Sequence, residues 1–260
     1  MVRQVLGTEF LKLRHSAVPW ITLAAFSLGP LGVALFLWIA ADPRRAHGLG
    51  LIGAKAGLLG LSPTWPDFLA MFAEIVGGLG LLLLAFIVAY LFGREYQEGT
   101  AKTMLTSPAP RPFFVLAKFA VAAAWWALIL VAACIEAAAI GLALSLSGFT
   151  AGLALSTLWR TLSLAGIAFL LSSLVGWVAV LGKGYLAPLG FALATLALGN
   201  LFAHTGWARW FPWSIPMLLS GSLGGRPGTL PPGGLAIFCV TFAVGVVATA
   251  LQLRLGDNTQ

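Results

Sequence analysis

The sequence predicts an all-α membrane protein with six transmembrane helices, and three observations support this fold class. Of the 260 residues, 60% are hydrophobic and only 9% are charged, whereas a soluble domain is about a quarter charged. The apolar runs are continuous and do not alternate, which excludes a transmembrane β-barrel. Six of these runs are close to or longer than the roughly 20 residues that a helix needs to cross the hydrocarbon core.

The six predicted spans belong to a single transmembrane domain of residues 1–260, because the chain shows no repeat and no low-complexity segment. They cover residues 17–41, 68–92, 117–146, 152–181, 185–203 and 233–253. The third and fourth spans are longer than a crossing requires, so we expect them to tilt or to end in the interface.

Residues 2–16 precede the first span and predict an amphipathic helix in the inner membrane interface. Val2, Leu6, Phe10 and Leu13 recur at helical spacing with charged residues between them, a pattern typical of interfacial helices. The apolar run that follows is about twice as long as the core of a cleavable signal peptide, which has about 7–15 residues. A frayed, positively charged leader is the alternative.

The positions of the basic residues predict that both termini lie in the cytoplasm, because inner loops are richer in Lys and Arg. With the N-terminus inside, the inner segments hold nine of the fifteen Lys and Arg residues: Arg3, Lys12, Arg14, Arg94, Lys102, Arg111, Lys118, Lys183 and Arg254. The outer segments hold Arg44, Arg45, Lys55, Arg160, Arg209 and Arg226. The net charge of +7 therefore indicates topology and contact with anionic membrane lipid. We expect no nucleic-acid partner, because the basic residues are scattered.

The polar segment of residues 94–107 joins the second and third spans and predicts a separate cytoplasmic helix. It is longer than a hairpin turn requires, and it stops at Ser107-Pro108, since proline disfavours helix in the residue before it. A polar helix held against the membrane face between two spans is suited to bind a soluble partner.

This segment carries a pattern that resembles the E-x3-G-T-x4-L-x2-P-x2-R-x6-K signature of ABC-2 type permeases. The matching positions are Glu95, Gly99, Thr100, Leu105, Pro108, Arg111 and Lys118. Pro110 departs from the pattern, because the family more often has a small polar residue there. The resemblance implies a permease subunit of an ATP-binding-cassette exporter in the cell membrane, whose separate ATPase subunit binds ATP and Mg²⁺. It also implies that residues 2–16 are an elbow helix.

The resemblance further implies that residues 94–107 form a coupling helix that docks on the ATPase. The residues expected to contribute are Glu95, Glu98, Gly99, Thr100, Met104, Leu105 and Arg111. Glu95 and Glu98 would present charge on one helix face, since they lie three residues apart. Gly99 would allow close backbone approach, and Met104 and Leu105 would supply apolar contact. A solvated loop whose charges only fix topology is the alternative.

A dimer of permeases, either two identical copies or one copy with a sister subunit, is implied by the same resemblance. It places the second and fifth spans at the central seam. The second span contains Gly77, Gly78 and Gly80, and small residues permit close approach of helices in lipid. We therefore expect these glycines at the subunit interface; packing within one subunit is the alternative.

Three charged residues, Glu74, Glu136 and Arg160, fall in the outer half of the predicted spans. At about 1.5 Å of rise per residue they lie roughly 9, 15 and 12 Å from the outer ends of their spans. Intramembrane charges tend to face protein or water. We expect Glu136 to pair with Arg160, because their spans are neighbours in sequence, and Glu74 to line the transport route. Arg160 extending to the outer interface is the alternative.

The outer segment 204–232 predicts an interfacial or re-entrant piece between the fifth and sixth spans. It contains Trp207, Trp210 and Trp213, and tryptophan prefers the membrane interface. The stretch from 213 to 219 is too short to cross the bilayer. A loop resting on the bilayer surface is the alternative.

The chain has no motif for ATP hydrolysis, so we expect no enzyme activity, cofactor or metal in it. The segment 176–184 has one residue too many before Gly182-Lys183 for a phosphate loop and lacks the Ser or Thr that binds Mg²⁺. Spans without an abundant charged lining suggest a hydrophobic or amphipathic cargo. The alternatives are an ATP-independent secondary transporter, which commonly shows an inverted repeat, and an intramembrane enzyme, which needs a catalytic constellation; neither feature is visible.

Overall fold

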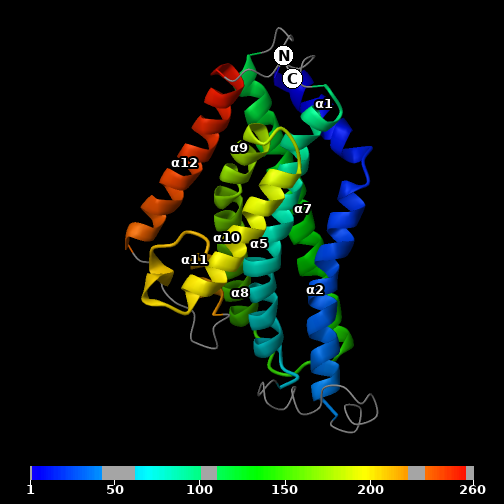
Figure 1. Cartoon of the computed structure of the whole chain (residues 1–260). Coiled ribbons are helices and arrows are strands. Elements are labelled where there is room, and N and C mark those ends of the chain that lie inside the picture. The colour runs from blue at the N-terminus through cyan, green and yellow to red at the C-terminus, as the bar shows by residue number, and fades with distance from the viewer. Residues whose placement is uncertain (1, 43–61, 101–109, 222–231, 256–260) are drawn as a thin grey trace.

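The computed structural model describes residues 2–42, 62–100, 110–221 and 232–255, which form a bundle of helices (Figure 1). The elements are α1 (Val2–Arg14), α2 (Val18–Ala40), α5 (Trp65–Gln97), α7 (Arg111–Ala143), α8 (Ala151–Leu171), α9 (Ser173–Leu181), α10 (Leu186–Ala203), η1 (Gly206–Arg209), α11 (Ile215–Ser220) and α12 (Pro232–Leu255). Six segments are long and apolar enough to cross a membrane: α2, α5, α7, α8 with α9, α10, and α12. The predicted all-α fold with six spans is therefore confirmed.

The first turn of α1 and the last turn of α12 lie at the same end of the bundle, which we call the terminal end (Figure 1). Helix α1 packs there against α7 and α2. It ends at Arg14, and its buried face differs from the predicted one. Leu13 is buried as expected, but the buried face also includes Glu9, whereas Phe10 is 51% exposed.

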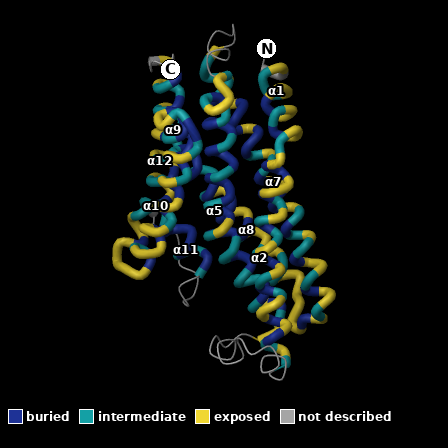
Figure 2. The backbone as a smooth tube through the Cα atoms, turned by 45° about the vertical axis from the view of Figure 1, so that its right-hand side comes forward, coloured by how far each residue is buried: buried dark blue, intermediate teal, exposed yellow. Residues whose placement is uncertain are grey.

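Helix α5 is the central helix of the bundle. It contacts α2, α7, α8, α9, α10 and α11, and most of its residues are buried or half-buried (Figure 2). At its start, Thr64 accepts a hydrogen bond from the backbone N–H of Asp67, a side-chain cap that favours helix initiation. Its large apolar side chains, such as Phe68, Phe72 and Leu84, form the core of the molecule.

The predicted coupling helix cannot begin at Arg94, because residues 94–97 are the last turn of α5. No proline interrupts the chain between Pro66 and that turn, so the helix continues past the predicted end of the second span at residue 92. It ends just before Gly99, whose φ of +67° is a left-handed conformation that favours glycine. The rest of the predicted coupling helix, residues 101–107, lies outside the described residues.

The third and fourth spans also differ from their predicted bounds. Helix α7 begins at Arg111 instead of residue 117, because Pro112 is compatible with the first turn of a helix. The fourth span is interrupted at Ser172, between α8 and α9. There the hydroxyls of Ser172 and Ser173 donate to the carbonyls of Phe169 and Leu170, a type of bond that bends helices.

The segment after α10 turns back into the bundle. Helix α11 contacts α5, α8 and α10, and a Cβ at Gly77 of α5 would lie 3.3 Å from the Cβ of Ser220. Gly77 is roughly 18 Å along α5 from Trp65 at about 1.5 Å per residue. Packing at this depth favours the re-entrant alternative over a loop resting on the surface.

Candidate functional site

Four charged side chains at the terminal end form a closed ring, which we call the charge ring. Glu9 and Lys12 come from α1, Glu95 from α5 and Lys118 from α7. The Lys12 Nζ lies 2.9 Å from Glu95 Oε1 and 3.3 Å from Glu9 Oε1. The Lys118 Nζ lies 2.9 Å from Glu9 Oε2 and 3.0 Å from Glu95 Oε1. Each cation therefore contacts both anions.

Three of the four members of the charge ring are almost completely buried. Glu9, Glu95 and Lys118 are 2–3% exposed, whereas the Lys12 side chain is 30% exposed; the ring carries no net charge. Burial lowers the pKa of Lys12, but the carboxylates of Glu95 and Glu9 outweigh that effect, so its pKa is raised. Lys118 also donates to the carbonyl of Leu91 at 2.7 Å. Buried charges are tolerated only when they are paired in this way, so the ring fastens α1, α5 and α7 to one another.

Several residues of the permease signature take part in this architecture. The left-handed Gly99 turns the chain so that Thr100 Oγ1 donates to Glu95 Oε2 at 2.6 Å. On the other side of residues 101–109, Arg111 Nη1 donates to the carbonyls of Leu253 and Arg254 at 2.6 and 3.1 Å. A cation at the C-terminus of α12 also interacts favourably with the helix dipole. Residues of the signature thus anchor the chain on both sides of residues 101–109.

The two glutamates expected to share a charged face are separated by the structure. Glu95 is 2% exposed and faces the charge ring, whereas the side chain of Glu98 is 50% exposed and pairs with Arg94 at 3.1 Å. The prediction that Glu95 and Glu98 both present charge on one accessible helix face is wrong, because the carboxylate of Glu95 is buried and paired with the lysines of the charge ring. Met104 and Leu105 lie outside the described residues.

Sequence reasoning missed two members of the charge ring, Glu9 and Lys12, and gave Lys118 no role beyond the signature. A signal was present in α1. Glu9 and Lys12 are an acid and a base three residues apart on a helix whose other inward residue is Leu13. Opposite charges at this spacing lie on one helix face, and on an inward face they need partners from other helices.

Within the membrane-spanning part, Arg160 does not pair with Glu136. No ion pair or hydrogen bond joins the two among the described residues. Arg160 instead interacts electrostatically with Glu74, and its Nη2 donates to the carbonyl of Ser220 in α11. The expectation failed because α8 packs chiefly along α5 and not along α7, its neighbour in sequence.

The glycines of α5 are not equivalent. A Cβ at Gly77 would meet Ser220, and a Cβ at Gly80 would lie 2.8 Å from the Trp126 ring, whereas Gly78 has nothing within 4 Å. Gly77 and Gly80 therefore pack inside this chain, which contradicts their predicted place at a subunit interface. The reason is that Trp126 and α11 fill the space beside them.

One face of α5 stays partly exposed along the membrane, and we call it the α5 stripe. Between residues 71 and 92, every α5 residue that does not belong to this stripe is buried. Its members recur at helical spacing: Met71, Glu74, Ile75, Gly78, Leu79, Leu82, Phe86 and Tyr90. Such a face on an otherwise central helix is available to lipid or to another subunit.

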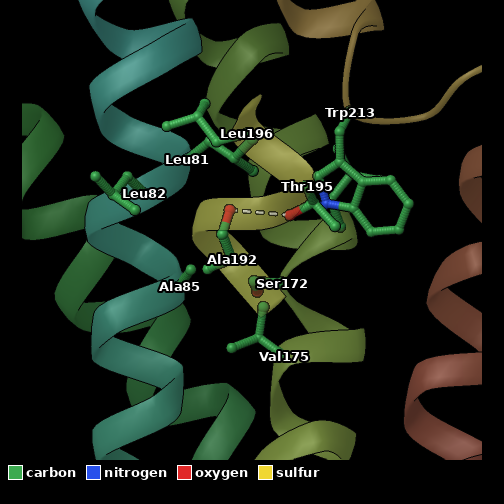
Figure 3. Close-up of a pocket in the computed structure, with 10 residues that line it drawn as sticks. Leu81, Leu82, Ala85, Ser172, Val175, Ala192, Thr195, Leu196 and Trp213 are labelled. Atoms are coloured by element: carbon green, nitrogen blue, oxygen red, sulfur yellow. Dashed lines mark hydrogen bonds between the residues drawn. The ribbon is translucent and has the colours of Figure 1, made fainter. Parts of the chain in front are cut away.

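The space between α5, α9 and α10 is nearly closed (Figure 3). The cavity there has about 10 Å³, roughly the minimum needed for a single water molecule. Thr195 donates to the carbonyl of Ala192 at 3.0 Å, and Ser172 likewise bonds a carbonyl of its own helix. This cavity is too small for a cargo molecule.

Comparison with known proteins agrees with this architecture. The pattern of the ABC-2 family transporter proteins matches residues 5–199. The bacitracin transport permease protein BCRB of Bacillus licheniformis is 25% identical over 199 residues, which cover 73% of this chain and 95% of that protein. No solved structure matches the chain. The chain belongs to the ABC-2 family of transporter proteins, and it is a multi-pass membrane subunit of an ABC transporter.

Proposed function

We propose that this chain is the permease of an ABC exporter and that a separate ATP-binding-cassette ATPase docks on its terminal end, which faces the cytoplasm. The observation that carries the proposal is the clamping of both flanks of residues 101–109. Thr100 is held by Glu95 on one side, and Arg111 is held by the end of α12 on the other. A segment anchored at both ends passes a displacement to the helices that anchor it.

The charge ring would distribute that displacement. It joins α1, α5 and α7 through three interhelical ion pairs, so movement of the segment reaches three helices together. In this proposal Glu95 acts by holding the segment, and the ATPase contacts come from the accessible Glu98 together with Met104 and Leu105.

Docking is tested by charge reversal at Glu98 and by Leu105→Arg, each co-expressed with the ATP-binding-cassette ATPase encoded nearest to this chain. We expect unchanged yield of folded permease and at least a severalfold loss of co-purified ATPase, because both changes alter the docking surface. Arg209→Glu, an exposed charge reversal far along the chain in η1, is the matched control. Equal ATPase recovery in all variants would contradict the docking proposal.

The cargo proposed here is hydrophobic or amphipathic, and the relative named for bacitracin transport supports a peptide of that kind. We further propose that two permease subunits, identical or sister, meet along the α5 stripe and enclose the route between them. The small cavity between α5, α9 and α10 agrees with a route that lies outside the single subunit. Cargo movement that continues after ATP is depleted would instead support an ATP-independent transporter.

A further inference from the structure

A second cavity lies at the terminal end between α1, α2 and α7, and it has a different character. This crevice has a volume of about 310 Å³, within the range of small-molecule sites. Its floor includes the buried Leu13 and Pro19. Its lining also includes Trp20 and Leu128, which are 73% and 52% exposed. The crevice is therefore apolar and opens toward the membrane.

Arg14 is the one charged residue in the lining. It is exposed and makes no hydrogen bond or ion pair with the described part of the chain. Lys12, the other basic residue in the last turn of α1, is occupied by the charge ring. An exposed guanidinium beside an apolar crevice is free to bind an anion, and it forms strong bidentate bonds with phosphate.

One tryptophan indicates the level of the crevice in the bilayer. Trp20, in the first turn of α2, lines the crevice together with Trp125 of α7, and a tryptophan at the end of a span prefers the level of the lipid head groups. The Trp125 indole is fixed there, because its Nε1 donates to Thr22 Oγ1 at 3.0 Å. An occupant that is apolar at one end and anionic at the other would match both the apolar lining and Arg14.

We propose that this crevice binds one anionic phospholipid from the leaflet at the terminal end. Its phosphate contacts Arg14, and an acyl chain fills the apolar space between α1, α2 and α7. Glu9 and Lys12 of the charge ring lie on the same helix as Arg14. The lipid and the charge ring would therefore both hold α1 in place. This lipid site is independent of the docking proposal, since it requires only the membrane location.

The head-group contact is tested by native mass spectrometry of the purified full chain, titrated separately with phosphatidylglycerol and phosphatidylcholine. We expect one preferred phosphatidylglycerol in the wild type and, for Arg14→Gln, an affinity for phosphatidylglycerol about fivefold lower, the usual effect of one basic residue. The loss for phosphatidylcholine should be smaller, because its choline cation already offsets the phosphate charge. Arg254→Gln, another exposed arginine at the terminal end, is the matched control and should bind like the wild type. Equal binding of the two lipids by the wild type would overturn the proposal.

The acyl-chain contact is tested by filling the crevice. Leu128→Trp should weaken binding of both lipids, while Ile135→Trp, which alters another exposed position on the same helix outside the crevice, should leave binding unchanged. The same spectra show how much of the chain is dimeric. This distinguishes a second copy of the chain from a lipid as the occupant of the crevice. Loss of dimer with unchanged lipid binding in Leu128→Trp would overturn the lipid site, and so would unchanged lipid binding in both Arg14→Gln and Leu128→Trp.

Discussion

At the scale of single residues, two glutamates near the end of α5 have opposite surroundings. Glu95 is 2% exposed and contacts two lysines and a threonine. Glu98 has a half-exposed side chain and pairs with Arg94 four residues away. Exposed pairs contribute about 0–1 kcal/mol, whereas removing one partner of a buried pair costs about 3–5 kcal/mol. The same residue type therefore has a structural role at one position and an accessible charge at the other.

We predict that Glu95→Gln lowers the free energy of unfolding by about 3–5 kcal/mol, because it leaves the buried Lys118 and the partly exposed Lys12 facing the single carboxylate of Glu9. Glu98→Gln, the matched control on the same helix end, should cost less than about 1 kcal/mol. Unfolding of the purified chain in detergent measures both. Similar losses for the two variants would show that the charge ring does not stabilise the fold.

The raised pKa of Lys12 gives the charge ring a defined pH dependence. A cation with a raised folded pKa contributes stability that is fully present below its unfolded pKa, about 10.4, and that is lost as the pH rises through the folded value. We predict that the difference in melting temperature between wild type and Lys12→Met is constant from neutral pH to about pH 9 and shrinks above about pH 10.4. A difference that already falls near neutral pH would contradict this assignment.

At the scale of elements, the placement of α8 decides which charges meet. Helix α8 follows α7 in the chain, yet it packs chiefly along α5. Arg160 is thereby directed to Glu74 on α5 and to the end of α11 at Ser220. Glu136 on α7 is half-buried and outside this group.

We predict that a double-mutant cycle with Glu74→Gln and Arg160→Gln gives a coupling energy of about 1 kcal/mol, since neighbouring charges show couplings of this order. The cycle with Glu136→Gln and Arg160→Gln should give a coupling near zero. The free energy of unfolding in detergent, measured under reversible conditions for every single and double variant, supplies both cycles. A larger coupling for Glu136 than for Glu74 would contradict the packing of α8 on α5.

At the scale of the whole molecule, the bundle leaves one face of its central helix partly exposed. The α5 stripe is mostly apolar, and it contains Gly78 and Leu82, whereas Gly77 and Gly80 face α11 and Trp126 of the same chain. Small residues on an open face let helices approach closely in lipid. In the proposed dimer, this asymmetry places the second subunit on the α5 stripe.

We predict that cysteines at Gly78 and Leu82 crosslink two permeases under mild oxidation, because these positions lie on the open face. Gly77→Cys lies one residue away but is packed against Ser220, so it should form no crosslink. The native Cys134 and Cys239 are first replaced by alanine, and crosslinking is read as a dimer band. Crosslinking at Gly77 without crosslinking at Gly78 or Leu82 would refute the proposed interface.

The sequence by itself determined the fold class, the number of spans and the family. These follow from local properties: the length of an apolar run is set by the thickness of the bilayer, and the signature from Glu95 to Lys118 is contiguous in the chain. Even the continuation of α5 beyond residue 92 had a local cause, since the first left-handed residue is Gly99. That boundary was missed because the charges of 94–98 were interpreted as the start of a new helix.

Only the tertiary structure decided the partners of the charges and glycines. The signature singles out Glu95 but not its burial, and nothing local distinguishes Gly77 from Gly78; the roles of these residues depend on which helices lie beside α5. Order along the chain suggested Glu136 for Arg160, but the partner came from α5, because helices in a bundle are matched by the packing of their surfaces and not by sequence adjacency. The charge ring likewise exists only where α1, α5 and α7 converge.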